Sequence, residues 1–290
     1  MPLPSVHYRL GALALEEWSE RPHAAPFDLL DPHSRNFFWQ GTLGPDTGLF
    51  PGGEPSFALR AHHERTGDLT RVLLASASSD AERAFAWGWL THVLADVALH
   101  PLINRYALRL AFIRGDDPED PQALAAAHGR YEVGLDVHVL ARDAGVRRVR
   151  LRHAFDGAAI EYLARAFETT YGISVDRVAL LRSHRAVTRM ANLLGLLERV
   201  HALAAPAGMR RELLCALGAM AAPRLDVISR AFLAPLPSPR PLLAALRATE
   251  SHFAELVRRH QADGLAGLGN PDLDGLELPA PTLAVVAPAA

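Results

Sequence analysis

The chain has 290 residues, of which 49% are hydrophobic and 21% are charged, and its formal net charge is -2. This composition is typical of a globular protein with one large domain or two, and the balanced charge excludes a global field that attracts nucleic acid or an anionic membrane. The single cysteine, Cys215, excludes intramolecular disulfides and cysteine-rich zinc motifs, and because all 30 basic residues are arginine, lysine-dependent chemistry is excluded as well.

Helical periodicity dominates the chain and strand alternation is scarce, which predicts an all-α protein. Residues 6–17 are predicted to form the first helix, and residues 20–55, rich in Pro, Gly and Asp, a long loop. A second helix is expected over residues 56–75, and a buried helix over the apolar run 85–103. A turn-rich connection over residues 115–121 then leads to another helix, which includes His128.

The second half of the chain is also predicted to be helical. Two or three amphipathic helices are expected between residues 155 and 222, interrupted at 171–174, where Ser174 fits a helix N-cap. A proline-rich break over residues 235–241 precedes a last helix over residues 241–261. We therefore expect a helical core over residues 1–150, a helical C-terminal half over 151–262 packed on that core, and a loosely ordered tail over 263–290.

Neither the start of the chain nor its longest apolar run indicates a membrane segment. The start Met1-Pro2-Leu3-Pro4 lacks the basic and apolar regions of a signal peptide. The run 85–103 is nearly long enough to span a bilayer, but three ionisable side chains on one face would then lie in lipid at considerable cost. A buried helix of a cytoplasmic protein is the expectation.

Two rows of metal-ligand side chains are the most informative feature of the sequence. Each row has three members at steps of four residues, which lie on one face of an α-helix. The rows are His92, Asp96 and His100, followed by His128, Glu132 and Asp136. Asp96 has apolar neighbours and therefore needs a partner, and imidazole and carboxylate are ordinary zinc ligands. The sequence predicts a metal site in the core over residues 1–150, and the alternative is a buried hydrogen-bonded His-Asp network.

These residues resemble the zinc-dependent phospholipases C, whose all-α superfamily also includes the single-strand-specific zinc nucleases. The resemblance covers roughly residues 1 to 140. It is carried by His7 in Pro2-Leu3-Pro4-Ser5-Val6-His7, by Asp46 in Gly44-Pro45-Asp46, by His62-His63-Glu64-Arg65-Thr66, by the segment from Gly88 to Pro101, and by His128 with Glu132. It implies a multi-helix bundle of this type with a helical C-terminal extension.

The resemblance also implies a zinc site with two to three ions in which metal-bound water attacks a phosphodiester. Asp46, His62 or His63, His92 and Asp96 would hold the first zinc, Asp96 and His7 the second, and His100, His128 and Glu132 the third. Asp46 would also orient or deprotonate the water. Iron or manganese would suit the same kinds of ligand.

Five other side chains have more than one interpretation. His62 and His63 point about 100° apart on a helix, so we expect one to bind metal and the other to support it. Asp136 could bind metal, but fixing the ring of a metal-bound histidine is the commoner role of such a carboxylate. Phe38 and Trp39, which precede Asp46 in the expected loop, could line a substrate cleft.

The residues leave the substrate class open. Five arginines could dock phosphate, but their alternation with apolar residues favours a solvated exposed strand. They are Arg142, Arg147, Arg148, Arg150 and Arg152. Without a basic track, a lipid or small amphiphilic phosphoester is favoured over nucleic acid, with Phe37, Phe38, Trp39, Leu49 and Phe50 as a candidate apolar rim. The alternatives are a nuclease of the same superfamily and a non-catalytic, metal-stabilised helical binding protein.

Overall fold

The computed structural model describes residues 4–115, 117, 120–152, 155–203 and 240–273, and over these ranges the chain is helical with no strand. The elements in chain order are α1 (Pro4–Glu20), η1 (Pro22–Ala24), α2 (Pro32–Gly41), α3 (Pro55–His63), α4 (Thr66–Ser76), α5 (Asp80–Arg114), α6 (Pro121–Arg142), η2 (Val146–Arg148), α7 (Gly157–Tyr171), α8 (Arg177–Leu203) and α11 (Arg240–Ala262). The prediction of an all-α fold is confirmed.

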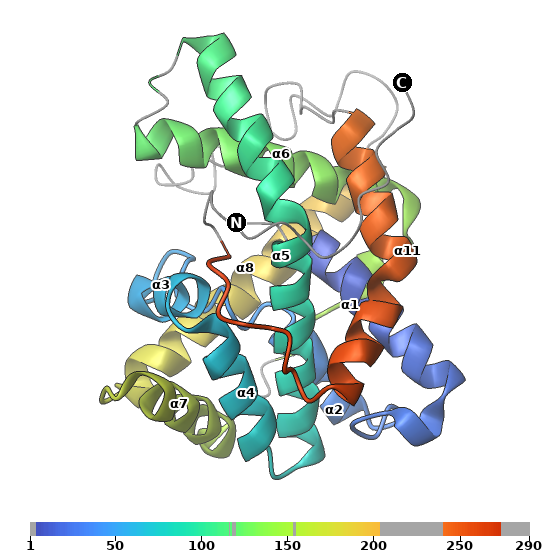
Figure 1. Cartoon of the computed structure of the whole chain (residues 1–290), viewed down its shortest axis with the longest axis vertical. Coiled ribbons are helices and arrows are strands. Elements are labelled where there is room, and N and C mark those ends of the chain that lie inside the picture. Colours follow the sequence, from blue (N-terminus) through green and yellow to red (C-terminus); the bar gives the residue numbers. More distant parts are fainter. Residues whose placement is uncertain (1–3, 116, 118–119, 153–154, 204–239, 274–290) are drawn as a thin grey trace.

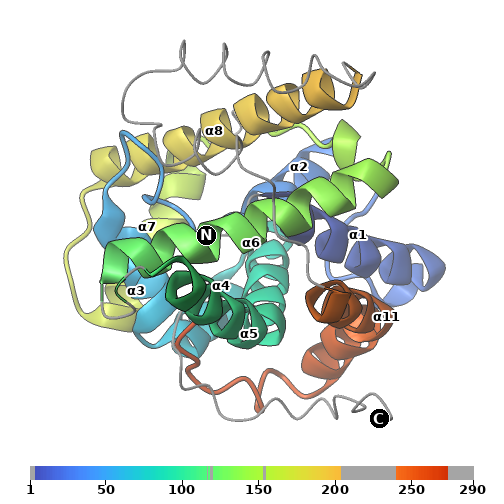
Figure 2. The ribbon, with the colours of Figure 1, turned by 90° about the horizontal axis from the view of Figure 1, so that it is seen from above.

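The long helix α5 is the centre of the fold. It has 35 residues, runs through the middle of the molecule and contacts α1, α2, α4, α6 and α11, while α6 lies across it (Figures 1 and 2). Its start is fixed by a capping box, in which Ser79 and Glu82 each accept a backbone N–H from the other. Its end is fixed by Gly115, whose φ of 71° is accessible to glycine without strain. The expected helix over residues 85–103 is therefore the central part of α5.

Close contact between α2 and α5 depends on glycine. A Cβ on Gly41 would lie 2.1 Å from the carbonyl oxygen of Phe85, and a Cβ on Gly88 would lie 2.1 Å from that of Phe38. Both distances are far below contact, so a larger residue at either position would push the helices apart. Around this contact, Trp18 packs edge-on against Phe27 and Phe38, within one core cluster that also includes buried residues of α7, α8 and α11.

Several expected boundaries are wrong. The expected loop 20–55 contains α2, which begins with Asp31 as N-cap and a proline at its first position. The expected helix 56–75 is divided into α3 and α4 at Arg65, whose φ is 50°. Asp176, and not Ser174, precedes α8 and accepts the backbone N–H groups of Val178 and Ala179.

The expected exposed strand over residues 146–151 does not form. The short helix η2 takes its place, and Val146 and Leu151 are buried instead of alternating with a solvent face. The helices expected up to residue 222 are described as α7 and α8 as far as Leu203, and residues 204–222 lie outside the described ranges.

The expected loose tail also differs from the structure as far as it is described. Leu265 and Leu273 are buried, and the backbone N–H of Leu273 donates to the carbonyl of His62 at 2.8 Å. Residues 274–290 lie outside the described ranges. Among the described helices, none has the length and apolar character needed to cross a membrane.

Candidate metal centre

The row of ligand-type side chains on α5 is buried in the middle of the fold. His92, Asp96 and His100 follow one another at intervals of one helical turn, and each is at most 1% exposed. The two oxygens of Asp96 face four imidazoles. Oδ1 lies 3.5 Å from Nε2 of His7 and 3.4 Å from Nε2 of His100. Oδ2 lies 2.9 Å from Nε2 of His92 and 3.9 Å from Nε2 of His62.

Each of four histidines is oriented through its Nδ1 atom. The acceptors are the carbonyls of Ala58, Thr42 and Leu273 for His62, His92 and His100, and the side-chain oxygen of Asn104 for His128, at 2.6 to 2.9 Å. A backbone carbonyl only accepts, so Nδ1 of the first three carries the proton. Their Nε2 atoms therefore point into the cluster as the atoms available to a metal.

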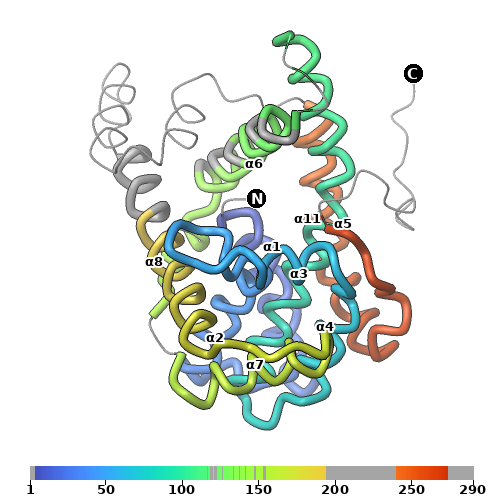
Figure 3. The backbone as a smooth tube through the Cα atoms, turned by 90° about the vertical axis from the view of Figure 1, so that its left-hand side faces the viewer, coloured from blue at the N-terminus to red at the C-terminus, as the bar shows by residue number. Residues whose placement is uncertain are grey.

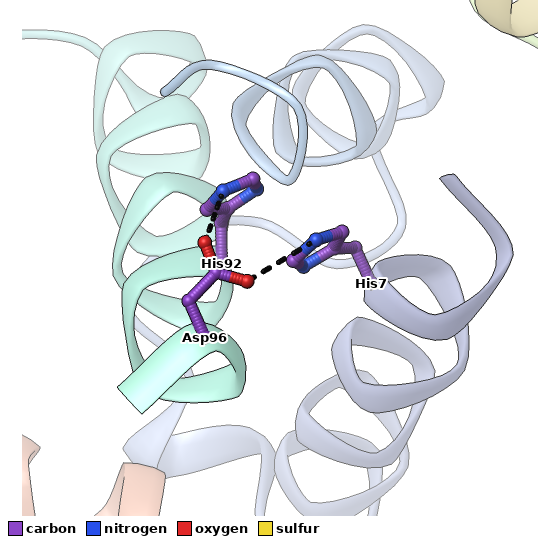
Figure 4. A group of neighbouring side chains, drawn as sticks. All are labelled: His7, His92 and Asp96. Carbon is purple, nitrogen blue, oxygen red and sulfur yellow. Dashed lines mark ion pairs between the residues drawn. The ribbon is translucent and has the colours of Figure 1, made fainter. Parts of the chain in front are cut away.

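A first group of possible ligands joins α1 to α5. It consists of His7, His92 and Asp96, whose ligand atoms lie within 4.8 Å of one another. His7 comes from α1 and stacks on His92 with ring centroids 3.9 Å apart, while both imidazoles face the carboxylate of Asp96 (Figure 4).

Asp136 contacts the start of α1. Its carboxylate accepts the backbone N–H groups of Ser5 at 3.0 Å and of Val6 at 2.9 Å. These belong to the first turn of α1, where N–H groups lack partners within the helix. These two bonds therefore anchor the helix that carries His7.

A second group brings the loop after α2 to the cluster. Asp46, His62 and His92 lie within the same 4.8 Å limit, with Nε2 of His62 3.4 Å from Oδ1 of Asp46. His63 is turned away, and its Nδ1 lies 2.8 Å from Asp272 near the surface. The geometry therefore places His62, and not His63, in this group of possible ligands.

A third group joins α5 to α6. His100, His128 and Glu132 lie within 4.8 Å of one another, with Nε2 of His100 3.4 Å from Oε1 of Glu132 and Nε2 of His128 in close contact with the same oxygen. All three are buried. The two predicted rows thus face each other across α5 and α6, except that Asp136 serves α1.

Electrostatics in this cluster follow from burial opposed by neighbouring charge. Burial lowers the pKa of His7 to about 3, and His92 acts in the same direction. Burial also acts to lower the pKa of His92, but Asp96 and Asp46 outweigh it and raise that pKa to about 9. Burial acts to raise the pKa of Asp96, but His100, His92 and His7 hold it well below its usual range. Asp96 is thus an ionised carboxylate shared by several imidazoles.

The ligand atoms that have no hydrogen bond within the cluster fit a metal. Both oxygens of Asp46 and both ring nitrogens of His7 are buried and have no hydrogen-bond partner among the described residues. Such atoms normally cost stability, and divalent cations satisfy imidazole nitrogen and carboxylate oxygen together. The residues present therefore fit zinc.

The expected substrate residues lie away from this cluster's ligand atoms. Phe38 is fully buried against Trp18, so the prediction that it lines a cleft is wrong. Trp39 is partly buried and lines a separate hollow of about 480 Å³ with Tyr8 and Arg9. Beside the metal ligands lies a cavity of about 10 Å³, lined in part by His7 and Glu132. That volume is about one water molecule.

The apolar rim differs from expectation, whereas most of the described arginine side chains are exposed as expected. Phe37 and Phe50 are buried, which leaves Leu49 and Trp39 partly exposed. Of the arginines, Arg142, Arg148 and Arg152 are exposed as expected for a solvated face, Arg150 is partly buried, and the side chain of Arg147 is not described. Arg142 also pairs with Glu250.

Sequence reasoning missed the groups that orient the histidines. The carbonyls of Ala58, Thr42 and Leu273 carry no side-chain signal, so a pattern of residue types cannot reveal them. Asn104 could have been found, because it lies one turn beyond His100 on the same helix face.

Comparison with known proteins agrees with this site. A sequence model of the zinc dependent phospholipase C family matches residues 6–178, which include every candidate ligand from His7 to Glu132 and extend past the expected limit near residue 140. No curated protein and no solved structure matches the chain. Because the family match covers more than half of the 290 residues, the chain belongs to the zinc dependent phospholipase C family.

Proposed function

We propose that the protein is a metal-dependent phosphodiester hydrolase that uses two to three zinc ions. The observation that carries the proposal is the buried cluster of eight imidazole and carboxylate side chains, in which Nε2 atoms and carboxylate oxygens face one another. The family match adds zinc dependence at the level of the family. A hydrogen-bonded network without metal is disfavoured, because it leaves both oxygens of Asp46 without hydrogen-bond partners among the described residues.

The three groups support a proposed distribution of the ligands among the ions. Asp46, His62 and His92 would hold the first ion, Asp96 with His7 the second, and His100, His128 and Glu132 the third. His92 is close to both of the first two positions, and Asp96 lies between all three. Bound zinc supplies an activated water and stabilises charge on the phosphoryl oxygens. Iron and manganese bind similar donors, and elemental analysis distinguishes them.

Metal content tests the site. Protein purified without chelators should carry at least about two metal equivalents per chain, because eight donor side chains exceed what one four-coordinate ion can use. His92→Ala and Asp96→Asn should lower that number. His252→Ala, which changes an exposed histidine on α11, should leave it unchanged. A folded wild-type protein without metal would contradict the proposal.

Asp46 is the proposed catalytic residue. Its carboxylate is 1% exposed, has no hydrogen-bond partner among the described residues, and lies beside His62 and His92, so it can hold a proton taken from the attacking water. Asp46→Asn should abolish phosphodiester hydrolysis in a protein that stays folded. Asp28→Asn, an exposed carboxylate before α2, is the matched control. Full activity in Asp46→Asn would remove this residue from the mechanism.

A lipid or small amphiphilic phosphoester is the proposed substrate class. The family match supports it, and the net charge of -2 does not supply the basic track that a nuclease requires. The test compares phosphatidylcholine dispersions with single-stranded DNA at two salt concentrations. Faster, salt-sensitive cleavage of DNA would favour the nuclease alternative.

One observation favours the non-catalytic alternative. The cavity beside the ligands is about 10 Å³, so a phosphodiester fits in this cavity only if the residues that line it move. A binding protein stabilised by metal would need no such movement. Inactivity of the wild type on phospholipids, nucleic acids and chromogenic esters, with its metal confirmed, would support this alternative.

A further inference from the structure

A segment that follows α11 reaches the candidate metal centre, although the family match ends at residue 178. We call residues 264–273 the C-terminal strap. The strap runs beside α3, α4 and α5, as the red stretch in Figures 1 and 3 shows. In the strap, Leu273 contacts His100 of α5, which lies 173 residues earlier in the sequence.

Leu273 links two of the ligand groups. Its side chain is fully buried, and its backbone N–H donates to the carbonyl of His62 at 2.8 Å. Its own carbonyl accepts the Nδ1–H of His100 at 2.6 Å. His62 belongs to the group with Asp46, and His100 to the group with Glu132. The backbone of one residue therefore holds the positions of two candidate ligands from different groups.

The strap is fastened to α4 by an N-cap that α4 itself lacks. Arg65 occupies the N-cap position and makes no capping bond through its side chain. Asn270 supplies the missing acceptor, because its Oδ1 accepts the backbone N–H of Asp68 at 2.9 Å. Next to it, Asp272 pairs with His63 at 2.8 Å. These contacts place Leu273 at the buried end of the strap.

The surface of α4 is shaped to admit the strap. A Cβ on Gly67 would lie 1.6 Å from the carbonyl oxygen of Gly269, so only glycine allows the strap to approach this closely. Gly67 is part of α4, where alanine is a better helix former. The glycine therefore serves the contact and not the helix.

We propose that the C-terminal strap is a positioning element of the metal centre, with the Leu273 carbonyl fixing the ring of His100. This inference rests on the proposed function, because it gives His100 a metal to bind. The carbonyl keeps the proton on Nδ1 and directs Nε2 towards Glu132 and Asp96. Leu273 acts through His100 and does not touch the reacting atoms.

The test displaces the strap without changing a ligand. Gly67→Ala should push Gly269 away, whereas Gly267→Ala is a matched control in the strap itself, because its added Cβ meets nothing within 4 Å. Gly67→Ala should weaken the binding of one zinc ion by about 10- to 100-fold, as loss of a ligand's orienting partner does, and leave the other ions in place. Competition with a zinc chelator and elemental analysis measure this.

A second readout does not depend on metal or activity. In ¹⁵N-histidine NMR of the metal-free protein, the hydrogen-bonded Nδ1 proton of His100 should be visible in the wild type and in Gly267→Ala but lost in Gly67→Ala. The Leu273 amide should lose its protection from hydrogen exchange in the same variant. If Gly67→Ala does not fold, Asn270→Ala replaces it, with Asn270→Asp as the rescue that keeps an acceptor.

The outcomes separate the two proposals. A wild type without zinc contradicts the proposed function, while loss of the His100 proton in Gly67→Ala would still support positioning by Leu273. Equal zinc affinity at every site in the wild type and in a folded Gly67→Ala or Asn270→Ala variant would overturn the strap proposal alone.

Discussion

Asp136→Ala should destabilise the protein through α1. The carboxylate of Asp136 is fully buried and accepts the N–H groups of Ser5 and Val6, the two residues that precede His7. Alanine leaves both N–H groups without this acceptor in a region closed to water. The first turn of α1 must then shift or remain unsatisfied, and His7 loses its fixed position relative to Asp96.

The magnitude follows from these two bonds. A hydrogen bond to a charged group contributes about 1.5 to 3 kcal/mol, so two give about 3 to 6 kcal/mol. Removing the buried carboxylate also removes its desolvation cost, which places the expected loss near the lower end, at about 3 kcal/mol. With a urea m-value of about 3 kcal/mol/M, the midpoint of unfolding should fall by about 1 M. Asp136→Asn keeps one acceptor and should lose roughly half as much.

Urea unfolding of the metal-free protein, followed by tryptophan fluorescence, measures this loss. Zinc titration should show weaker binding in the group that contains His7, with the group of His100 retained. The matched control is Asp156→Ala, which removes the N-cap of α7, a helix without candidate ligands. That change should cost about 1 kcal/mol and leave zinc content unchanged.

One result would refute the reasoning. If Asp136→Ala unfolds at the same urea concentration as Asp156→Ala and binds zinc like the wild type, the two backbone bonds do not anchor α1. Asp136 would then belong with the candidate ligands, and its loss would have to be sought in metal content instead.

Two further predictions concern the metal and the packing of α2 on α5. Dialysis against a chelator should lower the melting temperature, because the buried carboxylates lose the positive charge of the metal, and added zinc should restore it. Differential scanning fluorimetry measures this change. An unchanged melting temperature would contradict a bound metal that stabilises the fold. Gly88→Ala should cost at least about 1 to 3 kcal/mol of stability, because its Cβ would lie 2.1 Å from the Phe38 carbonyl oxygen. Gly157→Ala meets nothing within 4 Å, and equal urea midpoints for the two variants would refute the packing argument.

The sequence by itself determined the helical character and most of the candidate ligands. Steps of four residues put His92, Asp96 and His100 on one face of α5 because the α-helix repeats every 3.6 residues, whatever surrounds it. The same local geometry placed His128 and Glu132 together on α6. Ligand chemistry could be predicted from residue type, since buried carboxylates and imidazoles without partners are costly.

Helix boundaries were harder to predict from the sequence where helix-capping residues and turn-forming residues occur in the same segment. The helix α2 was hidden in a segment rich in turn formers, although Asp31 and Pro32 mark its start. The division between α3 and α4 depends on the left-handed conformation of Arg65, which no residue type demands. Within α3, His62 lies inward and His63 at the surface, because successive residues of a helix point about 100° apart.

Only the tertiary structure decided how separate segments meet at the site. Asp136 and Glu132 lie one turn apart on α6, yet one anchors α1 and the other faces His100, because α1 packs against that part of α6. Phe38 is core because Gly41 and Gly88 bring α2 against α5. The Leu273 carbonyl reaches His100 across more than 170 residues of chain. Backbone groups are the same in every residue, so a sequence pattern predicts which side chains can bind a metal, but the packing of distant segments determines which backbone groups orient them.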